Sequence, residues 1–116
     1  MDERLEKAFG VANYMATLSN QRRIILEEYN QSLIYYSNGA TFKINQELIG
    51  FVKTLIDFDH IENVVITDSN NFPTLIGNLK TFLDDIIDKY MSATDQYASK
   101  FNEIKVKRKI ADIVDL

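Results

Sequence analysis

The chain has 116 residues, of which 46% are hydrophobic and 26% are charged, and its formal net charge is −4. This composition is typical of one globular domain, whereas disorder over most of the chain and nucleic-acid binding over its whole surface are disfavoured. Because the chain has no cysteine, disulfides, thiol nucleophiles and zinc ribbons are excluded, and a cytosolic compartment is favoured.

The charged start of the chain, residues 1–4, does not fit a signal peptide. No apolar run approaches the roughly 18 residues that span a bilayer. We therefore expect a single soluble domain over residues 1–116, located in the cytoplasm and without a membrane partner.

The first predicted element is a long amphipathic helix from about Asp2 to Tyr36, a stretch without proline. Its apolar and small residues recur at alternating steps of three and four, which is the heptad seam of a long helix. The seam consists of Leu5, Ala8, Ala12, Met15, Ser19, Arg22, Leu26, Tyr29, Leu33 and Tyr36. Because its middle is small or polar, we expect it to pack within its own domain. Residues 37–39, Ser-Asn-Gly, are predicted to cap the helix, since Asn and Gly tolerate the left-handed conformation.

Residues 40–44 alternate between polar and apolar side chains and predict a strand. Asn45 is a good N-cap for a following helix over residues 46–58, whose apolar residues recur at helical spacing. A β-branched run within residues 62–67 and a second run at 72–76 flank a polar turn, which predicts a hairpin. Pro73 cannot donate to a ladder, so it belongs at an edge or at the start of its strand.

Asn78 is the predicted N-cap of a last helix that runs from about residue 79 to past residue 104. The order of elements predicts an α+β fold with two long amphipathic helices at the N- and C-terminal ends and a short middle helix. The strands form a small, mostly antiparallel three-strand sheet, which we expect to pack against the middle helix. The two terminal helices are expected to run alongside each other.

His60 is the only histidine and follows the predicted middle helix. A catalytic base needs a nucleophile and an orienting group beside it, so a solvated or helix-capping imidazole is the favoured interpretation. Asp57, Asp59, Glu62 and Asp68 suggest a calcium or magnesium loop, but their spacing lacks the central glycine and final glutamate of an EF-hand. Because the chain also has no glycine-rich phosphate loop, we predict no enzyme activity, no cofactor and no metal.

Tyrosine suits contact surfaces, because its ring buries area while its hydroxyl stays hydrated. Apolar residues near the C-terminus are useful only if they dock on the first helix, on a second copy or on another protein. The candidate partner-binding residues are Tyr14, Tyr29, Tyr35, Tyr36, Tyr97, Ile110, Ile113, Val114 and Leu116. For the tyrosines, a place in the core or in an intramolecular seam is the favoured alternative.

Four of five residues are basic at positions 105–109, namely Lys105, Lys107, Arg108 and Lys109. Such a run can contact phosphates or an acidic partner. A solvated helix end that complements the helix dipole is the favoured alternative, because acidic residues flank the run and no aromatic residue lies within it to stack on bases.

Several segments resemble short proteins of T4-like tailed phages, especially phages of marine bacteria. They are residues 5–9 leading to 12–14, then residues 36–42, 47–52 and 105–114. The resemblance brings no activity and no functional residues. It implies a virion or assembly component, or a small protein that binds host machinery in the host cytoplasm.

Together these observations predict a non-catalytic protein–protein interaction or assembly protein, which forms a homo-oligomer and binds a phage or host protein. The alternative is a nucleic-acid-associated accessory protein that uses the basic run. A third, less favoured hypothesis is an enzyme or metal protein centred on His60.

Overall fold

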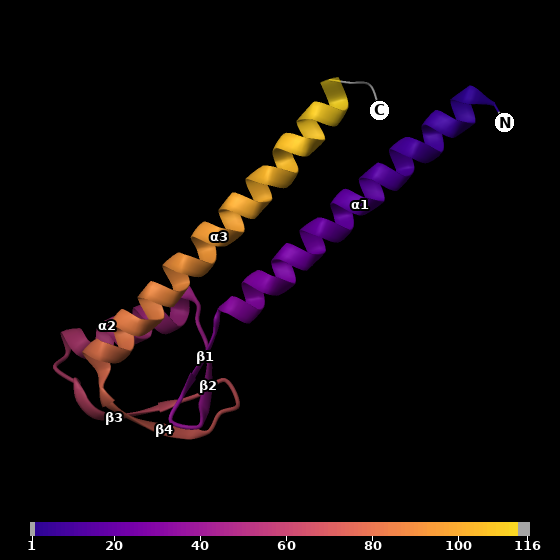
Figure 1. Cartoon of the computed structure of the whole chain (residues 1–116). Helices are drawn as coiled ribbons and strands as arrows, with labels where there is room; N and C mark the ends of the chain where they lie inside the picture. The colour runs from indigo at the N-terminus through magenta and orange to yellow at the C-terminus, as the bar shows by residue number, and fades with distance from the viewer. Residues whose placement is uncertain (1, 114–116) are drawn as a thin grey trace. The chain divides into compact units, whose positions relative to one another are not determined.

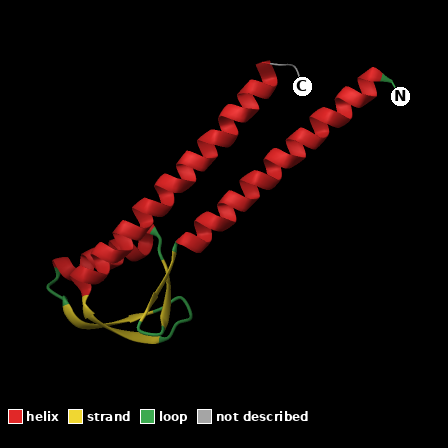
Figure 2. Ribbon diagram, in the orientation of Figure 1, coloured by secondary structure: helices red, strands yellow, loops and turns green. Residues whose placement is uncertain are grey.

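The computed structural model describes the backbone of residues 2–113 and the side chains of residues 2–106. Along this stretch the elements are α1 (Glu3–Ser32), β1 (Ile34–Ser37), β2 (Ala40–Lys43), α2 (Gln46–Asp57), β3 (Glu62–Thr67), β4 (Pro73–Asn78) and α3 (Leu79–Ile113) (Figure 1). The class is α+β, as predicted, with helices and strands coloured separately in Figure 2. None of the helices in the described part of the chain is both long and apolar enough to cross a bilayer.

The chain packs as two compact units. The first unit consists of Met1–Tyr29 together with Asp95–Leu116, and the second unit is Asn30–Thr94. Each of the two long helices contributes residues to both units.

In the first unit, segments of α1 and α3 run antiparallel to each other, which confirms the predicted pairing of the terminal helices there. The Tyr29 and Tyr97 rings lie 4.5 Å apart, centroid to centroid. The Lys100 ammonium donates to the Glu28 carboxylate at 2.6 Å. Leu18 of α1 and Ile104 of α3 are buried. Packing of apolar and aromatic side chains therefore joins the two segments.

The predicted seam of α1 is shifted from the face that packs. Tyr14, Leu18 and Ile25 are buried or half-buried, whereas Met15 and Leu26 of the predicted seam are exposed. Apolar residues are distributed all round α1, so their spacing alone permits more than one seam. The contacts with α3 select the one that is buried.

The second unit holds two antiparallel sheets of two strands, β1–β2 and β3–β4, so the predicted three-strand sheet is wrong. The extra strand is β1, which occupies residues predicted to end the first helix. Asn38 and Gly39 have φ angles of 51° and 77°, and Ser37 pairs with Ala40 across them. An Asn-Gly pair with both φ angles positive forms a two-residue hairpin turn, which uses the same left-handed conformation as a helix cap.

The core of the second unit gathers around the first half of α3. Phe42 of β2 meets Phe82 of α3 edge to face, with ring centroids 5.1 Å apart. The most fully buried residues in this core are Phe42, Ile44, Val52, Leu79 and Ile86. Both predicted caps are confirmed, because the Asn45 side chain accepts from the Leu48 amide at 2.7 Å and the Asn78 side chain accepts from the Thr81 amide at 3.1 Å. These local signals fix where α2 and α3 begin.

Candidate interaction surfaces

The β3–β4 hairpin exposes an uncharged apolar face. Its inward residues Ile66 and Ile76 are buried, and the opposite side carries Val65 directly across from Leu75. Val65 is 62% exposed and Leu75 is 56% exposed. We call the exposed set the hairpin face and define it as Val65, Thr67, Phe72, Pro73 and Leu75. Because contiguous exposed apolar patches are often contact surfaces, this cross-strand pair is a candidate contact surface.

Phe72 joins the hairpin face through the loop between β3 and β4. Its side chain is 65% exposed. Phe72, Pro73 and Leu75 line one side of a concavity of about 340 Å³, and the turn at Asn38 and Gly39 lines the other side. This part of the hairpin face therefore borders a shallow hollow whose lining is polar and apolar in about equal parts.

Asp68 holds this loop in place. Its carboxylate accepts hydrogen bonds from the backbone N–H groups of Phe72 at 2.9 Å, Thr41 at 3.2 Å and Asn70 at 2.9 Å. The bond from Phe72, supported by those from Thr41 and Asn70, lowers the pKa of Asp68, although burial opposes this shift. Because its oxygens bind backbone amides, Asp68 is a structural residue that fixes the position of Phe72.

A second concavity of about 310 Å³ lies between β2, α2 and the end of β3, and its lining includes Lys43, Phe51 and Ser69. The Ser69 hydroxyl donates to the Thr41 carbonyl at 2.7 Å, and no histidine lines this hollow. The arrangement thus offers no nucleophile beside a base. It provides a groove with a mixed polar and apolar lining, and the Phe51 ring lies half-exposed at its margin.

The acidic residues considered as metal ligands are held apart by other contacts. Asp57 pairs with Lys53 at 2.9 Å, and Asp68 binds the loop amides. His60 is exposed at the end of the turn that follows α2. Within residues 2–106, no three histidine or acidic side chains are grouped as a metal site requires.

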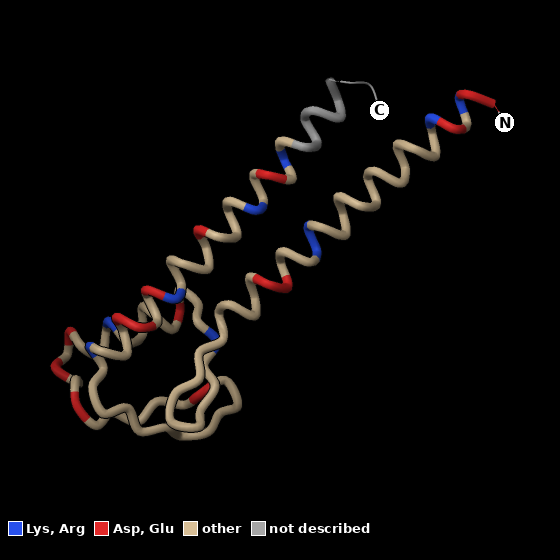
Figure 3. The backbone as a smooth tube through the Cα atoms, in the orientation of Figure 1, with Lys and Arg blue, Asp and Glu red and all other residues tan. Residues whose placement is uncertain are grey.

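The first unit has an uncharged surface on α1. Residues 8–21 contain no charged side chain, which Figure 3 shows as an unbroken tan stretch. At about 100° per residue, one set of exposed residues falls within a sector of about 120°. We call this set the helix stripe, and it consists of Leu5, Ala8, Phe9, Ala12, Met15, Ala16 and Ser19. Its largest side chain, Phe9, is 52% exposed.

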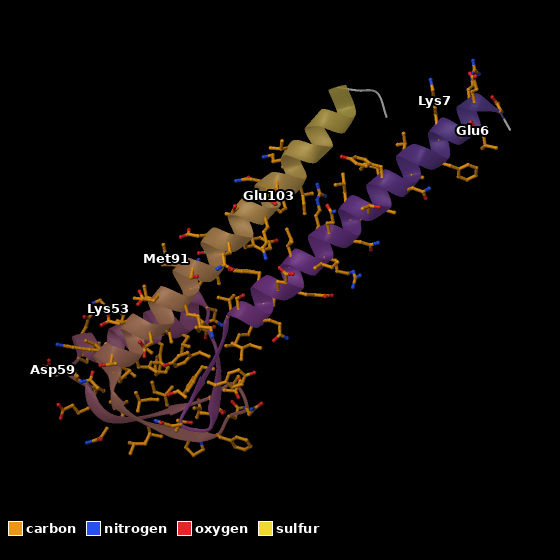
Figure 4. All side chains as sticks on the ribbon, in the orientation of Figure 1. Glu6, Lys7, Lys53, Asp59, Met91 and Glu103 are labelled. Carbon is orange, nitrogen blue, oxygen red and sulfur yellow. The ribbon has the colours of Figure 1, made fainter. Side chains whose placement is uncertain are left out.

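Charged residues flank the helix stripe at both ends. Asp2, Glu3 and Arg4 precede its first residue, and Arg22 and Arg23 follow its last one. Glu6 and Lys7, which Figure 4 labels, lie near the start of α1 but off the stripe. An apolar centre between charged margins is the usual composition of a protein interface.

The structure places the predicted tyrosines in different surroundings. Tyr29 and Tyr97 pack against each other inside the first unit. Tyr35 is half-buried, and its hydroxyl donates to Asp85 at 3.1 Å; burial and this bond raise the pKa of Tyr35. Tyr36 is 70% exposed on β1, and Tyr14 is half-buried on α1. Tyr29, Tyr35 and Tyr97 are therefore occupied within the chain, which leaves Tyr36 as the most accessible of the predicted contact tyrosines.

The C-terminal candidates are mostly outside what the structure describes. Lys105 is exposed on α3. The side chains of Lys107, Arg108, Lys109, Ile110 and Ile113, and the whole of Val114 and Leu116, lie outside the described residues.

Sequence reasoning missed the hairpin face as a contact surface. Five of the seven residues of the helix stripe were predicted as a seam that packs within the domain, but the structure leaves them exposed: Leu5, Ala8, Ala12, Met15 and Ser19. Val64, Val65 and Ile66 form three consecutive apolar residues, so strand alternation must turn one of them outward. The absence of charge over residues 8–21 was the corresponding signal in α1. Comparison with protein-family models, with curated proteins and with solved structures found no match.

Proposed function

We propose that this chain is a non-catalytic interaction protein that assembles with itself and binds a second protein through the hairpin face. The observation that carries the proposal is the exposure of large apolar side chains on uncharged surfaces, led by Val65 opposite Leu75. Burial of such a surface against a partner is favourable by about 25 cal/mol per Å² of apolar area.

The hairpin face is suited to binding because it is already held in shape. The Asp68 carboxylate and the Ser69 hydroxyl both bind Thr41, so the loop that carries Phe72 is fixed before any partner arrives. Less side-chain and loop entropy is then lost on association, which favours affinity. From the resemblance to short phage proteins, we propose an infected bacterial cell as the setting and a virion, assembly or host protein as the partner.

A comparative affinity capture tests the proposal. Leu75→Lys places a charge in the centre of the hairpin face, whereas Ser92→Lys adds the same charge at an exposed position of α3 in the same unit. We expect wild type and Ser92→Lys to retain a common protein from infected-cell lysate, and Leu75→Lys to lose it while keeping the same circular dichroism. Capture of the same proteins by all three chains would contradict the proposed role of the hairpin face.

A further inference from the structure

The helix stripe has the geometry of a surface made for a second helix. From Leu5 to Ser19 it extends about 21 Å along α1, at 1.5 Å per residue. The residues of α1 that pack inside the first unit, such as Tyr14 and Leu18, are centred about 140° away round the same helix. Another helix can therefore contact the stripe while the existing packing of α1 is kept.

We propose that the helix stripe binds the same stripe of a second copy of this chain, antiparallel and centred on Ala12. This inference rests on the proposed self-assembly and names its surface and orientation. With the two-fold axis at residue 12, a residue of one copy lies opposite the residue of the other copy whose number is 24 minus its own. Phe9 then faces Met15, a ring against a thioether, which is a favourable contact. The remaining opposed pairs are Leu5 with Ser19, Ala8 with Ala16 and Ala12 with itself.

The size of these residues suits close packing. A large side chain lies opposite a small one at Leu5 and Ser19, and alanines meet at 8 with 16 and at 12 with itself, so the helices can approach closely there. Phe9 and Met15 bring two large side chains together on each side of this alanine centre. Knobs of this kind need holes on the facing helix, and the small residues provide them. The stripe is thus complementary to itself when it is reversed.

Charge selects the antiparallel orientation over the parallel one. Arg22 is half-buried with its guanidinium over the Phe101 ring, so the charged residue at this end of the stripe is Arg23. In the antiparallel pair, Arg23 lies beside Asp2 of the second copy, because residue 22 is level with residue 2. In a parallel pair each of these residues would face its own kind, and like charges repel. The Arg23 side chain is accessible to the second copy, because it is 64% exposed and its ion-pair partner Glu27 is 63% exposed.

The other charges near the start of α1 are compatible with this pairing. At about 100° per residue, Glu6 and Lys7 point away from the stripe, and Arg4 is level with the uncharged Asn20 of the second copy. Opposite charges at the margins with none at the centre fix the register as well as the direction.

The pairing joins one stripe to another, so its area lies at the low end of specific interfaces and the dimer is expected to be weak. Sedimentation or light scattering should show the mass rising from 13.4 kDa toward twice that value as concentration rises from micromolar to several hundred micromolar.

A matched pair of variants locates the interface. Ala12→Glu places two like charges together at the axis, whereas Asn13→Glu adds the same charge one residue away, off the stripe. Both positions are exposed within the chain, so the fold should be kept. We expect Ala12→Glu to stay monomeric at several hundred micromolar and Asn13→Glu to dimerise like wild type. A monomeric wild type, or equal dimerisation of the two variants, would overturn the proposal.

Single cysteines determine the orientation, because the natural chain has none. Under mild oxidation, a mixture of Ala8→Cys and Ala16→Cys chains should give the mixed disulfide and little of either homodimer, since only residues 8 and 16 come within bonding distance. Thr17→Cys, exposed on another side of α1, should cross-link poorly with each. Homodimers of Ala8→Cys and of Ala16→Cys would show a parallel pair and refute the antiparallel arrangement.

The two proposals fail separately. If Ala12→Glu and wild type are both monomers but the hairpin face still captures its partner, the helix pairing is wrong and the partner binding stands. If the cross-links form as expected while Leu75→Lys captures the same proteins as wild type, the hairpin proposal is the one that fails.

Discussion

Truncation of two adjacent isoleucines in α3 tests the packing of the second unit. Ile86 is fully buried, whereas Ile87 is 37% exposed. Ile86→Ala removes three carbons from the core, which costs about 2.4 kcal/mol in transfer free energy at about 0.8 kcal/mol per carbon. The cavity left behind adds to this, so we expect a loss of about 3–4 kcal/mol in the free energy of unfolding. The same change at Ile87 should cost about 1 kcal/mol, because its carbons are partly hydrated in the folded state.

Urea denaturation followed by circular dichroism measures both values. Alanine has the same helix propensity at either position, so that effect cancels between the two variants. A loss of about 3–4 kcal/mol is a large part of the stability of a small domain, which is about 5–15 kcal/mol, so the shift in midpoint should be obvious. If Ile87→Ala costs as much as Ile86→Ala, α3 does not present the face described above to the core.

Three further predictions follow from single residues or runs. The pKa of Asp68 is lowered in the folded state, so the ionised carboxylate stabilises the fold above the ordinary pKa of an aspartate, about 3.9, and this stabilisation is lost as the pH falls through the lower folded value. The difference in thermal midpoint between wild type and Asp68→Asn should therefore shrink between pH 5 and 2. A difference independent of pH would show that the carboxylate charge does not stabilise the fold. Gly39→Ala should destabilise the chain by about 1 kcal/mol, because φ is +77° at this position. Gly50→Ala in α2, where the added carbon meets open space, should stabilise the chain by about 0.5–1 kcal/mol. Stability changes of the same sign in both variants would contradict the left-handed turn at Gly39. Replacement of Lys105, Lys107, Arg108 and Lys109 with Gln should change nucleic-acid affinity little, because we expect wild type to bind only weakly; tight binding with a log–log salt slope near −3 to −4 would instead support a phosphate-binding role.

Local signals in the sequence predicted much of this fold. Asn45 and Asn78 were predicted as caps, since an N-cap requires only a side-chain acceptor three residues before the amide that it binds. Pro73 was expected at an edge or strand start, and it is the first residue of β4. These features depend on residues close in the sequence, so no knowledge of packing was needed.

The errors came where two structures share one local signature. Asn38 and Gly39 suit both a helix end and a hairpin turn, and Ile34–Ser37 continued the apolar spacing of α1 closely enough to hide β1. Pairing of β1 with β2 decides between these alternatives, and the periodicity of one segment cannot show it.

The candidate surfaces were harder to predict than the elements. A tyrosine is equally suited to a core and to an interface, and only the packed structure shows Tyr29 against Tyr97 and Tyr36 in solvent. The β-branched run that contains Val65 predicted a strand but did not show which of its residues is exposed, because that depends on how the hairpin is covered. Exposure depends on tertiary packing, so the sequence could identify candidate residues but not show which of them are exposed.

The contacts at Thr41 also protect an open strand edge. Thr41 belongs to β2, whose outer side has no neighbouring strand among the described residues. Its N–H donates to Asp68 and its carbonyl accepts from the Ser69 amide and hydroxyl, so both polar backbone groups are occupied. Unpaired edges invite strands of other molecules and lead to aggregation. The loop that holds Phe72 in position therefore also blocks uncontrolled strand pairing at this edge.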